Sequence, residues 1–211
     1  MYNLPYHEET NQQVIHEFIE KYPFAFLTGC DANQQPVATQ VPLFLEEVNN
    51  QMVLRGHFMK NTDHYLAFGQ SPIVLAVFTG KHTYVSATWY SNPNIPSTWN
   101  YMSVHARGKI KYLPESDLEG ILRKTTLHFE NDDKDSPTVY DNLDEAYRSR
   151  LLKMIVGFEI KIEKMEAVFK LSQDRDQKSY MNIIQQLKMQ DADGQAIADE
   201  MEKRASHLFD N

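Results

Sequence analysis

Residues 24–44 read FAFLTGCDANQQPVATQVPLF, and this stretch decides how the chain is expected to fold. Its two apolar parts, Phe24 to Gly29 and Val37 to Phe44, contain the β-branched and aromatic residues that strands favour. The polar run Asp31-Ala-Asn-Gln-Gln between them has the length of a hairpin connection. We therefore expect two neighbouring antiparallel strands at this point in the chain.

The segments around this hairpin predict more strands and several helices. A polar stretch at residues 46–51 separates the hairpin from the strand that follows it. Strands are expected at residues 52–58, 73–79, 83–86 and 98–113, with one or two more at 155–171. Helices are expected at residues 11–21, 62–68 (ended by Gly69), 115–129, 144–153, 176–189 and 194–208, and a loop at 92–97. Many short strands with few helices between them favour a mainly β (α+β) fold, an antiparallel barrel with peripheral helices.

The C-terminal segment has a different character from the rest of the chain. We expect residues 1–173 to form the barrel domain and residues 174–211 to form a helical hairpin packed on it or on a dimer. Each of the two helices has an apolar stripe, made by Ile183, Ile184 and Leu187 and by Ile197, Ala198, Met201 and Leu208. Residues 174–211 carry five Lys or Arg against eight Asp or Glu, which is the wrong sign for a DNA-reading element.

Composition excludes several classes of function. The chain has 211 residues and a formal net charge of −8, unlike the basic surface of most nucleic-acid binders. It contains neither a GxGxxG nor a GxxxxGK[ST] motif, so a Rossmann dinucleotide site and a Walker loop are not expected. The eight histidines are scattered and form no HExxH motif, so we expect no metal site.

The compartment is also indicated by composition. A single cysteine, Cys30, cannot form an intrachain disulfide and suits a reducing compartment. The longest apolar run, residues 73–78, is too short to cross a membrane, and the first residues show no secretory signal. We expect a soluble, cytoplasmic protein with no membrane partner.

The run Leu54-Arg-Gly-His-Phe-Met-Lys-Asn suggests a phosphate site. Arg55 and His57 share one face of the expected strand, and Gly56 between them allows close approach. Lys60 and Asn61 follow at the start of a helix, whose free N–H groups favour an anion. The alternative is an exposed strand end with ordinary charges.

Three other runs suggest an aromatic ligand. Both tryptophans of the chain, Trp89 and Trp99, lie in FTGKHTYVSATWY (residues 78–90) and PSTWNYMSVH (residues 96–105). Aromatic side chains among Ser, Thr and Asn suit a flat ligand that needs stacking faces and hydrogen bonds. The alternative is a barrel end filled by aromatic residues. In FKLSQ (residues 169–173), the polar side chains mark a turn that could close such a site.

In this order, the runs LRGHFMKN, FTGKHTYVSATWY, PSTWNYMSVHARG and FKLSQ resemble the PaiB-like, FMN-binding negative transcriptional regulator family. The resemblance extends from MYNLPYHEE to the helices after KLSQ. It implies a flavin-reductase-type split β-barrel, usually a homodimer with FMN at the subunit interface. Relatives of this kind include pyridoxamine-phosphate oxidases, flavin reductases and haem-degrading proteins.

Carried over to this chain, the resemblance implies a set of FMN contacts. The phosphate side would be formed by Arg55, His57, Lys60 and Asn61. The ring would be surrounded by Ser86, Trp89, Tyr90, Trp99, Asn100 and Tyr101, with Lys170, Ser172 and Gln173 closing the site. Thr88 departs mildly from the family pattern, which usually has a small or proline residue and serine before the Trp-Tyr pair, and this departure bears on the shape of the ring pocket.

The favoured function is an NAD(P)H-dependent, flavin reductase-like oxidoreductase in which the flavin carries the electrons. Its catalytic residues, electron donor and acceptor stay unassigned. One alternative is a flavin-responsive negative transcriptional regulator, although the charge disfavours DNA as a partner. A second is a haem-binding or haem-degrading relative, in which His57, His82 or His105 would supply a ligand.

Overall fold

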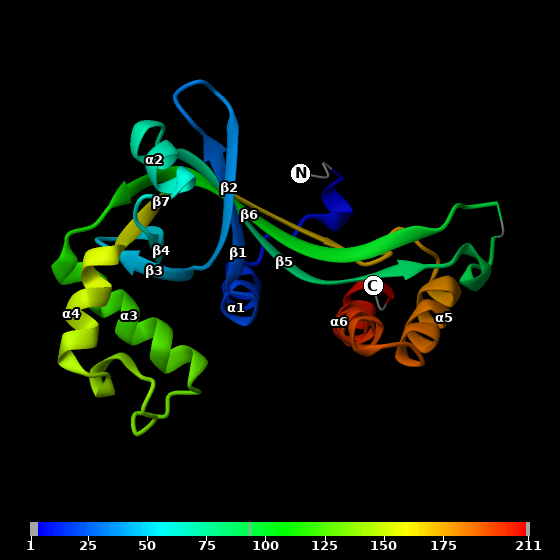
Figure 1. The fold of residues 1–211 in the computed structure, drawn as a ribbon. Coiled ribbons are helices and arrows are strands. Elements are labelled where there is room, and N and C mark those ends of the chain that lie inside the picture. Colours follow the sequence, from blue (N-terminus) through cyan, green and yellow to red (C-terminus); the bar gives the residue numbers. More distant parts are fainter. Residues whose placement is uncertain (1–3, 93, 210–211) are drawn as a thin grey trace. The chain divides into compact units, whose positions relative to one another are not determined.

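The computed structural model describes residues 4–92 and 94–209, which form strands and helices in nearly equal number (Figure 1). The strands are β1 (Phe24–Cys30), β2 (Pro36–Pro42), β3 (Phe44–Val48), β4 (Gln51–Met59), β5 (Ile73–Val85), β6 (Thr98–Tyr112) and β7 (Ile155–Lys170). The α-helices are α1 (Gln12–Lys21), α2 (Asp63–Gln70), α3 (Glu115–Phe129), α4 (Glu145–Met154), α5 (Gln177–Lys188) and α6 (Ala192–Phe209). Short 3-10 helices are η1 (Pro5–His7), η2 (Ala87–Trp89) and η3 (Tyr140–Asn142).

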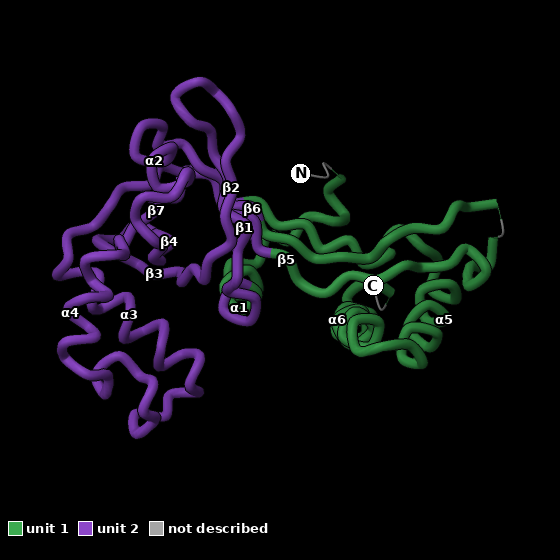
Figure 2. Tube along the Cα trace, in the orientation of Figure 1, with its two compact units in different colours: residues 1–18, 79–104, 166–211 green, residues 19–78, 105–165 purple. Residues whose placement is uncertain are grey.

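The strands belong to one antiparallel sheet in the order β2-β1-β5-β6-β7-β4-β3. The mainly β architecture predicted from the sequence is therefore confirmed. The chain divides into two compact units (Figure 2). Unit 1 contains residues 1–18, 79–104 and 166–211, and unit 2 contains residues 19–78 and 105–165.

In unit 2, β1 and β2 form the predicted hairpin, with Ala25 opposite Val41 and Gly29 opposite Val37. The turn is stabilised by the Asp31 carboxylate, which accepts hydrogen bonds from the backbone N–H groups of Asn33 (2.8 Å) and Gln35 (2.9 Å). Aspartate commonly fixes a turn in this way, because its short side chain reaches the backbone two residues on. Alternation then buries Ala25 and Leu27 in the core.

The prediction of one strand over residues 37–44 is wrong, because the strand is interrupted at Leu43. The Leu43 N–H donates to the Pro23 carbonyl (2.8 Å), which continues the β1–β2 register by one residue. Strand β3 then starts separately at Phe44. The polar stretch 46–51 is not a separator either, since its first half lies in β3 and its last residue begins β4. Asn49 and Asn50 have φ values of 52° and 61°, and they form the two-residue turn that joins β3 to β4. Asparagine tolerates this left-handed conformation, which hairpin turns of two residues require.

Two further elements differ from their predicted bounds. Helix α2 does not end at Gly69 but continues to Gln70, and the Ser71 N–H closes it on the Ala67 carbonyl (2.8 Å). A Cβ on Gly69 would lie 3.2 Å from the Tyr112 ring, so close packing explains this glycine. Strand β5 is continuous through Gly80 and Lys81, where a break was expected. Of the predicted loop at residues 92–97, Pro93 lies outside the described residues.

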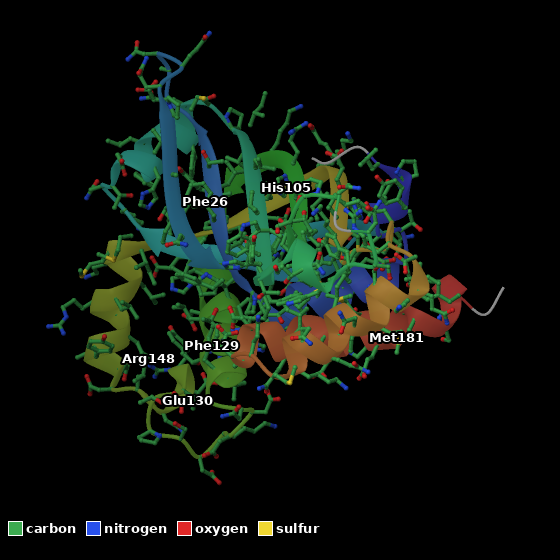
Figure 3. All side chains as sticks on the ribbon, turned by 90° about the vertical axis from the view of Figure 1, so that its right-hand side faces the viewer. Phe26, His105, Phe129, Glu130, Arg148 and Met181 are labelled. Carbon is green, nitrogen blue, oxygen red and sulfur yellow. The ribbon has the colours of Figure 1, made fainter. Side chains whose placement is uncertain are left out.

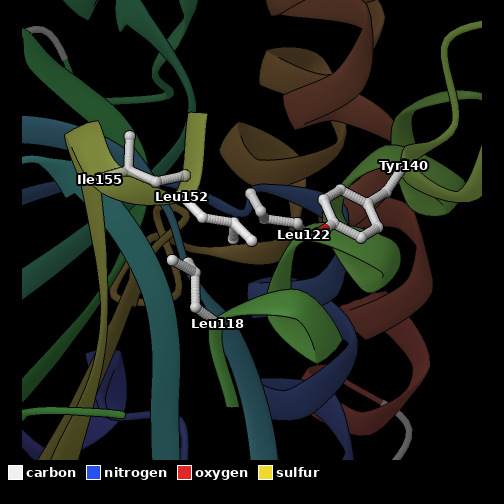
Figure 4. Packing of buried hydrophobic residues seen from close by; sticks show 5 residues of the cluster. All are labelled: Leu118, Leu122, Tyr140, Leu152 and Ile155. Carbon is white, nitrogen blue, oxygen red and sulfur yellow. The ribbon is translucent and has the colours of Figure 1, made fainter. Parts of the chain in front are cut away.

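Helices α3 and α4 contribute to a cluster of buried apolar side chains in unit 2 (Figure 4). Leu118 and Leu122 of α3 meet Leu152 of α4 and Ile155 at the start of β7, and Tyr140 of η3 packs beside them. All five side chains are buried. At about 1.5–3 kcal/mol for each large apolar side chain removed from water, this cluster is a main source of the stability of unit 2.

In unit 1, α5 and α6 lie side by side (Figure 1) and bury the predicted apolar stripes. Ile183, Leu187, Ile197 and Met201 are fully buried. Leu208 was predicted to share the second stripe, but it is 36% exposed because it lies in the last turn of α6. The helical hairpin therefore has a conventional apolar core.

We predict that Gly120→Ala stabilises the protein by about 0.5–1 kcal/mol, because glycine in a helix interior is less favourable than alanine. A Cβ at this position of α3 has no atom within 4 Å. Gly108→Ala is the control and should be strongly destabilising, since its Cβ would lie 2.1 Å from the Lys161 carbonyl oxygen. Urea denaturation of the three proteins measures both effects, and equal stabilities of the two variants would contradict the packing described.

Candidate functional site

The predicted phosphate group lies in unit 2, on β4 and at the start of α2. Leu54, Gly56 and Phe58 of β4 are buried, whereas Arg55 and His57 between them are partly exposed. This alternation places Arg55 and His57 on the same face, as the sequence predicts. A Cβ on Gly56 would lie 2.9 Å from the Pro42 carbonyl oxygen, so this glycine is required by the packing of β4 itself.

Arg55 is held by two carboxylates in this structure. Its Nε and Nη2 atoms donate to Oε2 of Glu159 (3.0 and 2.7 Å), which lies opposite it on β7. Its Nη1 atom lies 3.5 Å from Oε2 of Glu46. Glu159 is only 5% exposed and also contacts Nζ of Lys111 (2.9 Å). The guanidinium is therefore held in a partly buried ion pair, which was not predicted from the sequence.

The charge of Glu159 depends on these partners. Burial alone would raise the pKa of its carboxyl, but hydrogen bonds from Lys111 and Arg55 outweigh burial and hold the pKa below its ordinary value. Neither Glu159 nor Glu46 was identified from the sequence as a partner of Arg55. The only available signal was the alternation of β7, which does not give the register between distant strands.

His57 is neutral at pH 7, because burial lowers the pKa of its imidazole. It lies opposite Gly157, where α3 crosses the sheet: a Cβ on Gly157 would touch Ile121 at 3.1 Å. A neutral imidazole offers one N–H donor and one acceptor nitrogen. His57 can therefore donate a hydrogen bond, but it adds no charge to an anion site.

Lys60 and Asn61 lie beside a helix N-terminus, as predicted. The Lys60 ammonium donates to the Lys153 carbonyl (3.3 Å), and Asn61 has a φ of 62°. Thr62 caps α2: its Oγ1 atom accepts from the Tyr65 N–H (3.3 Å). The left-handed backbone at Asn61 turns the chain so that α2 starts directly after the strand.

A cavity of about 310 Å³ lies next to Arg55 in unit 2. It is lined by Glu46 and Arg55 and by four residues from the first half of α3, namely Ser116, Asp117, Gly120 and Ile121. The cavity contains one cationic and two carboxylate side chains. Its charge therefore does not favour an anion unless Arg55 exchanges a carboxylate partner.

The predicted ring residues lie in unit 1. Ser86 caps η2, because its Oγ atom accepts from the Thr88 N–H (3.3 Å). The hydroxyl oxygens of Ser86 and Thr88 lie 2.8 Å apart. Thr88 is the residue that departs from the family pattern. Trp89 is partly exposed, and Tyr90 is buried with the Arg175 guanidinium 4.9 Å from its ring centroid.

Trp99 is the most exposed aromatic side chain of this group. It is 54% exposed on β6, and its ring lies 6.0 Å from those of Tyr84 and His82 on β5. Tyr101, two residues along β6, is partly buried. These residues form an aromatic surface on the sheet of unit 1, available to stack against a flat group.

The remaining predicted ring residues stabilise the interior of unit 1. Asn100 and Ser172 are almost completely buried, and the Ser172 hydroxyl donates to Oδ1 of Asn100 (3.0 Å). The Lys170 ammonium donates to the Thr98 hydroxyl and to the Trp99 carbonyl (2.8 Å), and burial lowers its pKa. Gln173 contacts Nδ1 of His7 (2.9 Å). The structure joins these residues to one another, and their role as cofactor contacts stays a prediction.

A groove of about 620 Å³ lies beside Trp89 and Tyr90 in unit 1. Its other wall is α5, which contributes Lys178, Met181, Asn182 and Gln185. These four residues were not predicted as site residues. They lie on the polar side of an amphipathic helix, where side chains are ordinarily solvated, so the sequence carries no signal for them.

No group of three or more His, Cys, Asp or Glu residues within residues 4–92 and 94–209 could hold a metal ion. In the same part of the chain, no helix combines the length and the apolar character needed to span a membrane.

Comparison with known proteins identifies the class and the family. A solved structure of the flavocytochrome Anf3 from Azotobacter vinelandii matches 80% of this chain and 72% of its own, with a TM-score of 0.61 and 14% identity. The FAD and heme binding protein from Mycobacterium smegmatis matches 78% and 73%, with a TM-score of 0.60 and 16% identity. These matches show the fold, and the predicted antiparallel split β-barrel is confirmed.

The family follows from two sequence matches. A family model described as "Putative FMN-binding domain" matches residues 1–164. The chain is 35% identical over 189 residues to "Protease synthase and sporulation protein PAI 2" of Bacillus subtilis (strain 168), with 89% of each chain covered. The chain belongs to this PaiB-like family of FMN-binding-domain proteins.

We predict that Glu159→Gln lowers the free energy of unfolding by about 1.5–3 kcal/mol at pH 7, the usual contribution of a charged hydrogen bond. A carboxyl whose pKa is lowered by folding stabilises the protein above its unfolded pKa, and this contribution is lost as pH falls through the folded value. The stability difference between wild type and variant should therefore disappear as pH falls below about 4.5.

The control is Glu163→Gln, which removes an exposed pair with Lys109. It should change stability by less than about 1 kcal/mol. Urea titrations between pH 3 and 7 test both variants. A difference for Glu159→Gln that is small at pH 7, or that does not depend on pH, would show that the buried pair is not a stabilising one.

Proposed function

We propose that this chain is an FMN-binding, NAD(P)H-dependent oxidoreductase of the flavin reductase type, acting as a homodimer. The observation that carries the proposal is the match of residues 1–164 to the FMN-binding-domain family, together with the chemistry of β4 and the β5–β6 hairpin. The family match supports flavin binding. The electron donor, the reduction reaction and the dimer are inferences from the residues discussed next.

The residues of β4 and α2 fit the phosphate of FMN. Lys60 supplies a cation, whose ammonium donates to the Lys153 carbonyl at 3.3 Å. The N–H groups of His64 and Tyr65 in the first turn of α2 already donate to Asp63 and Thr62, so the phosphate contacts would come from side chains. Arg55 can join Lys60 by releasing Glu46, its weaker partner at 3.5 Å, while it keeps Glu159. His57 would donate one hydrogen bond from its neutral ring. FMN is therefore favoured over riboflavin, which has no phosphate.

The aromatic surface of unit 1 fits a flavin ring. Trp99 and Tyr84 are exposed, and a flat heteroaromatic group would stack on such side chains. When bound, FMN supplies the capacity to accept a hydride and pass on electrons. The contribution of the chain is to stack against the ring, to donate hydrogen bonds to its edge and to exclude water.

An apolar sheet face in unit 2 supports the homodimer. Phe24 and Phe26 of β1 are 58% and 44% exposed, and Ile73 of β5 is 60% exposed. Phe26, labelled in Figure 3, lies opposite Val77 in the β1–β5 pair, so these side chains share one face. A second copy of the chain would cover this face by two-fold pairing.

We further propose that residues 1–173 form the barrel domain and residues 174–211 an extension, and that the protein is cytoplasmic.

A transcriptional regulator is the second candidate, since the Bacillus subtilis relative is named a "Protease synthase and sporulation protein" and the chain resembles a family of negative regulators. Against direct DNA reading stands the acidic C-terminal extension, with eight Asp or Glu and five Lys or Arg in residues 174–211. Retention on duplex DNA that weakens with added salt, in the absence of NAD(P)H oxidation, would favour this candidate.

The phosphate assignment predicts that Lys60→Gln and Arg55→Ala weaken FMN binding much more than riboflavin binding. A charge-assisted hydrogen bond contributes about 1.5–3 kcal/mol, or about ten- to hundredfold in affinity. Flavin fluorescence titrations measure both ligands. Lys109→Gln, at an exposed lysine of β6, is the control and should bind both flavins as wild type does. Equal losses for FMN and riboflavin in the Lys60 variant would place the phosphate elsewhere.

The dimer proposal predicts that Phe26→Lys converts a dimer into a folded monomer, because it puts a charge on the shared apolar face. Leu66→Lys is a matched control, since Leu66 of α2 is 56% exposed and is not part of that face. Light scattering should give the mass of two chains for wild type and control, and of one chain for the Phe26 variant. A dimer that tolerates Phe26→Lys would exclude this face as the interface.

A further inference from the structure

The groove between η2 and α5 in unit 1 is a built feature of the structure. The Asn182 amide donates from Nδ2 to the Trp89 carbonyl (2.8 Å), and the Ser91 N–H donates to the Ser179 hydroxyl (2.8 Å). Asp176 caps α5 through the Ser179 N–H (3.0 Å). The end of the β5–β6 hairpin is thus fixed to the first turns of α5, and the groove has a defined width.

The two walls differ in chemistry. One is aromatic, because the partly exposed Trp89 ring and the ring of Tyr90 line it. The other is the side of α5 opposite its apolar stripe, where Lys178, Met181 and Gln185 follow one another at helical spacing. Met181, labelled in Figure 3, is 40% exposed. Neither the packing of α5 nor that of α6 accounts for these side chains.

The groove also has the charge and hydrogen-bonding groups of a specific site. Of the described residues that line it, Lys178 is the one cation and none is a carboxylate, although the surrounding extension is acidic. Asn182 and Gln185 present amide groups, which pair well with another carboxamide. An aromatic side chain suits one face of a flat ring, and a thioether suits its edge.

We propose that this groove binds the nicotinamide nucleotide that supplies electrons, with one face of its ring on Trp89 and its edge against Met181, so that the other face stays open for hydride transfer to the flavin. Its carboxamide would face Gln185 and Asn182, and a phosphate would face Lys178. The single phosphate of FMN is already assigned to Lys60 and Arg55. Lys178 is a further cation, and it lines a groove together with the Trp89 ring, so we infer that the groove takes a second nucleotide. The proposal rests on the proposed function, and it makes the C-terminal helix α5 part of a ligand site, outside the 1–164 match of the FMN-binding family model.

The test is an equilibrium titration of the full-length protein with NADH, followed by the change in NADH fluorescence, and a parallel titration with FMN. Met181→Ala, Gln185→Ala and Lys178→Gln should each weaken NADH binding by roughly three- to tenfold, the effect of losing one contact of about 1 kcal/mol. FMN binding should stay unchanged. Met189→Ala and Lys188→Gln are matched controls just outside the groove and should bind both ligands as wild type does.

The outcomes separate this inference from the proposed function. Groove variants that bind NADH as the controls do would overturn the inference, and so would variants that lose FMN affinity instead, because the groove would then hold the flavin. Wild type that binds FMN but not NADH also overturns it while leaving FMN binding intact. Wild type that binds neither ligand contradicts the proposed function itself.

Discussion

The pairing of β4 with β7 in a single register is the constraint on which the phosphate side of this protein depends. Arg55 lies opposite Glu159 and His57 opposite Gly157, so the cation faces a carboxylate and the imidazole faces a residue without a side chain. A shift of one residue would turn these groups into the core and expose Leu54 and Phe58. The ion pair between Arg55 and Glu159 therefore reinforces the same register that the apolar residues of β4 select.

The pairing of β4 with β7 also explains why Arg55 is held in an ion pair and can still bind an anion. Its strong contact is to the buried Glu159, and its contact to Glu46 is longer and more exposed. An arginine anchored on one side and weakly paired on the other can take an anion without a large rearrangement. Lys60 and the N-terminus of α2 lie directly after the same strand, so all four candidate phosphate residues follow from the placement of β4.

The sequence predicted the elements well where the signals were local. The helix predicted at residues 115–129 and the β1–β2 hairpin are confirmed. The prediction from sequence failed at Leu43 and at Asn49-Asn50. A break within a strand and a two-residue turn within a polar stretch do not change the local composition, so neither gave a signal. The partners of Arg55 and the α5 wall of the groove also escaped prediction, since both depend on contacts between residues far apart in the chain. The assignment of the phosphate candidates to unit 2 and of the ring candidates to unit 1 was equally unpredictable from the sequence.

Anaerobic addition of NADH to the purified protein loaded with FMN tests the central claim most directly. The account predicts a visible flavin absorption band that travels with the protein and bleaches when NADH is added, as the flavin takes up the hydride. A protein that retains no flavin would contradict the account. A haem Soret band in its place, or a bound flavin that neither NADH nor NADPH reduces, would contradict it as well.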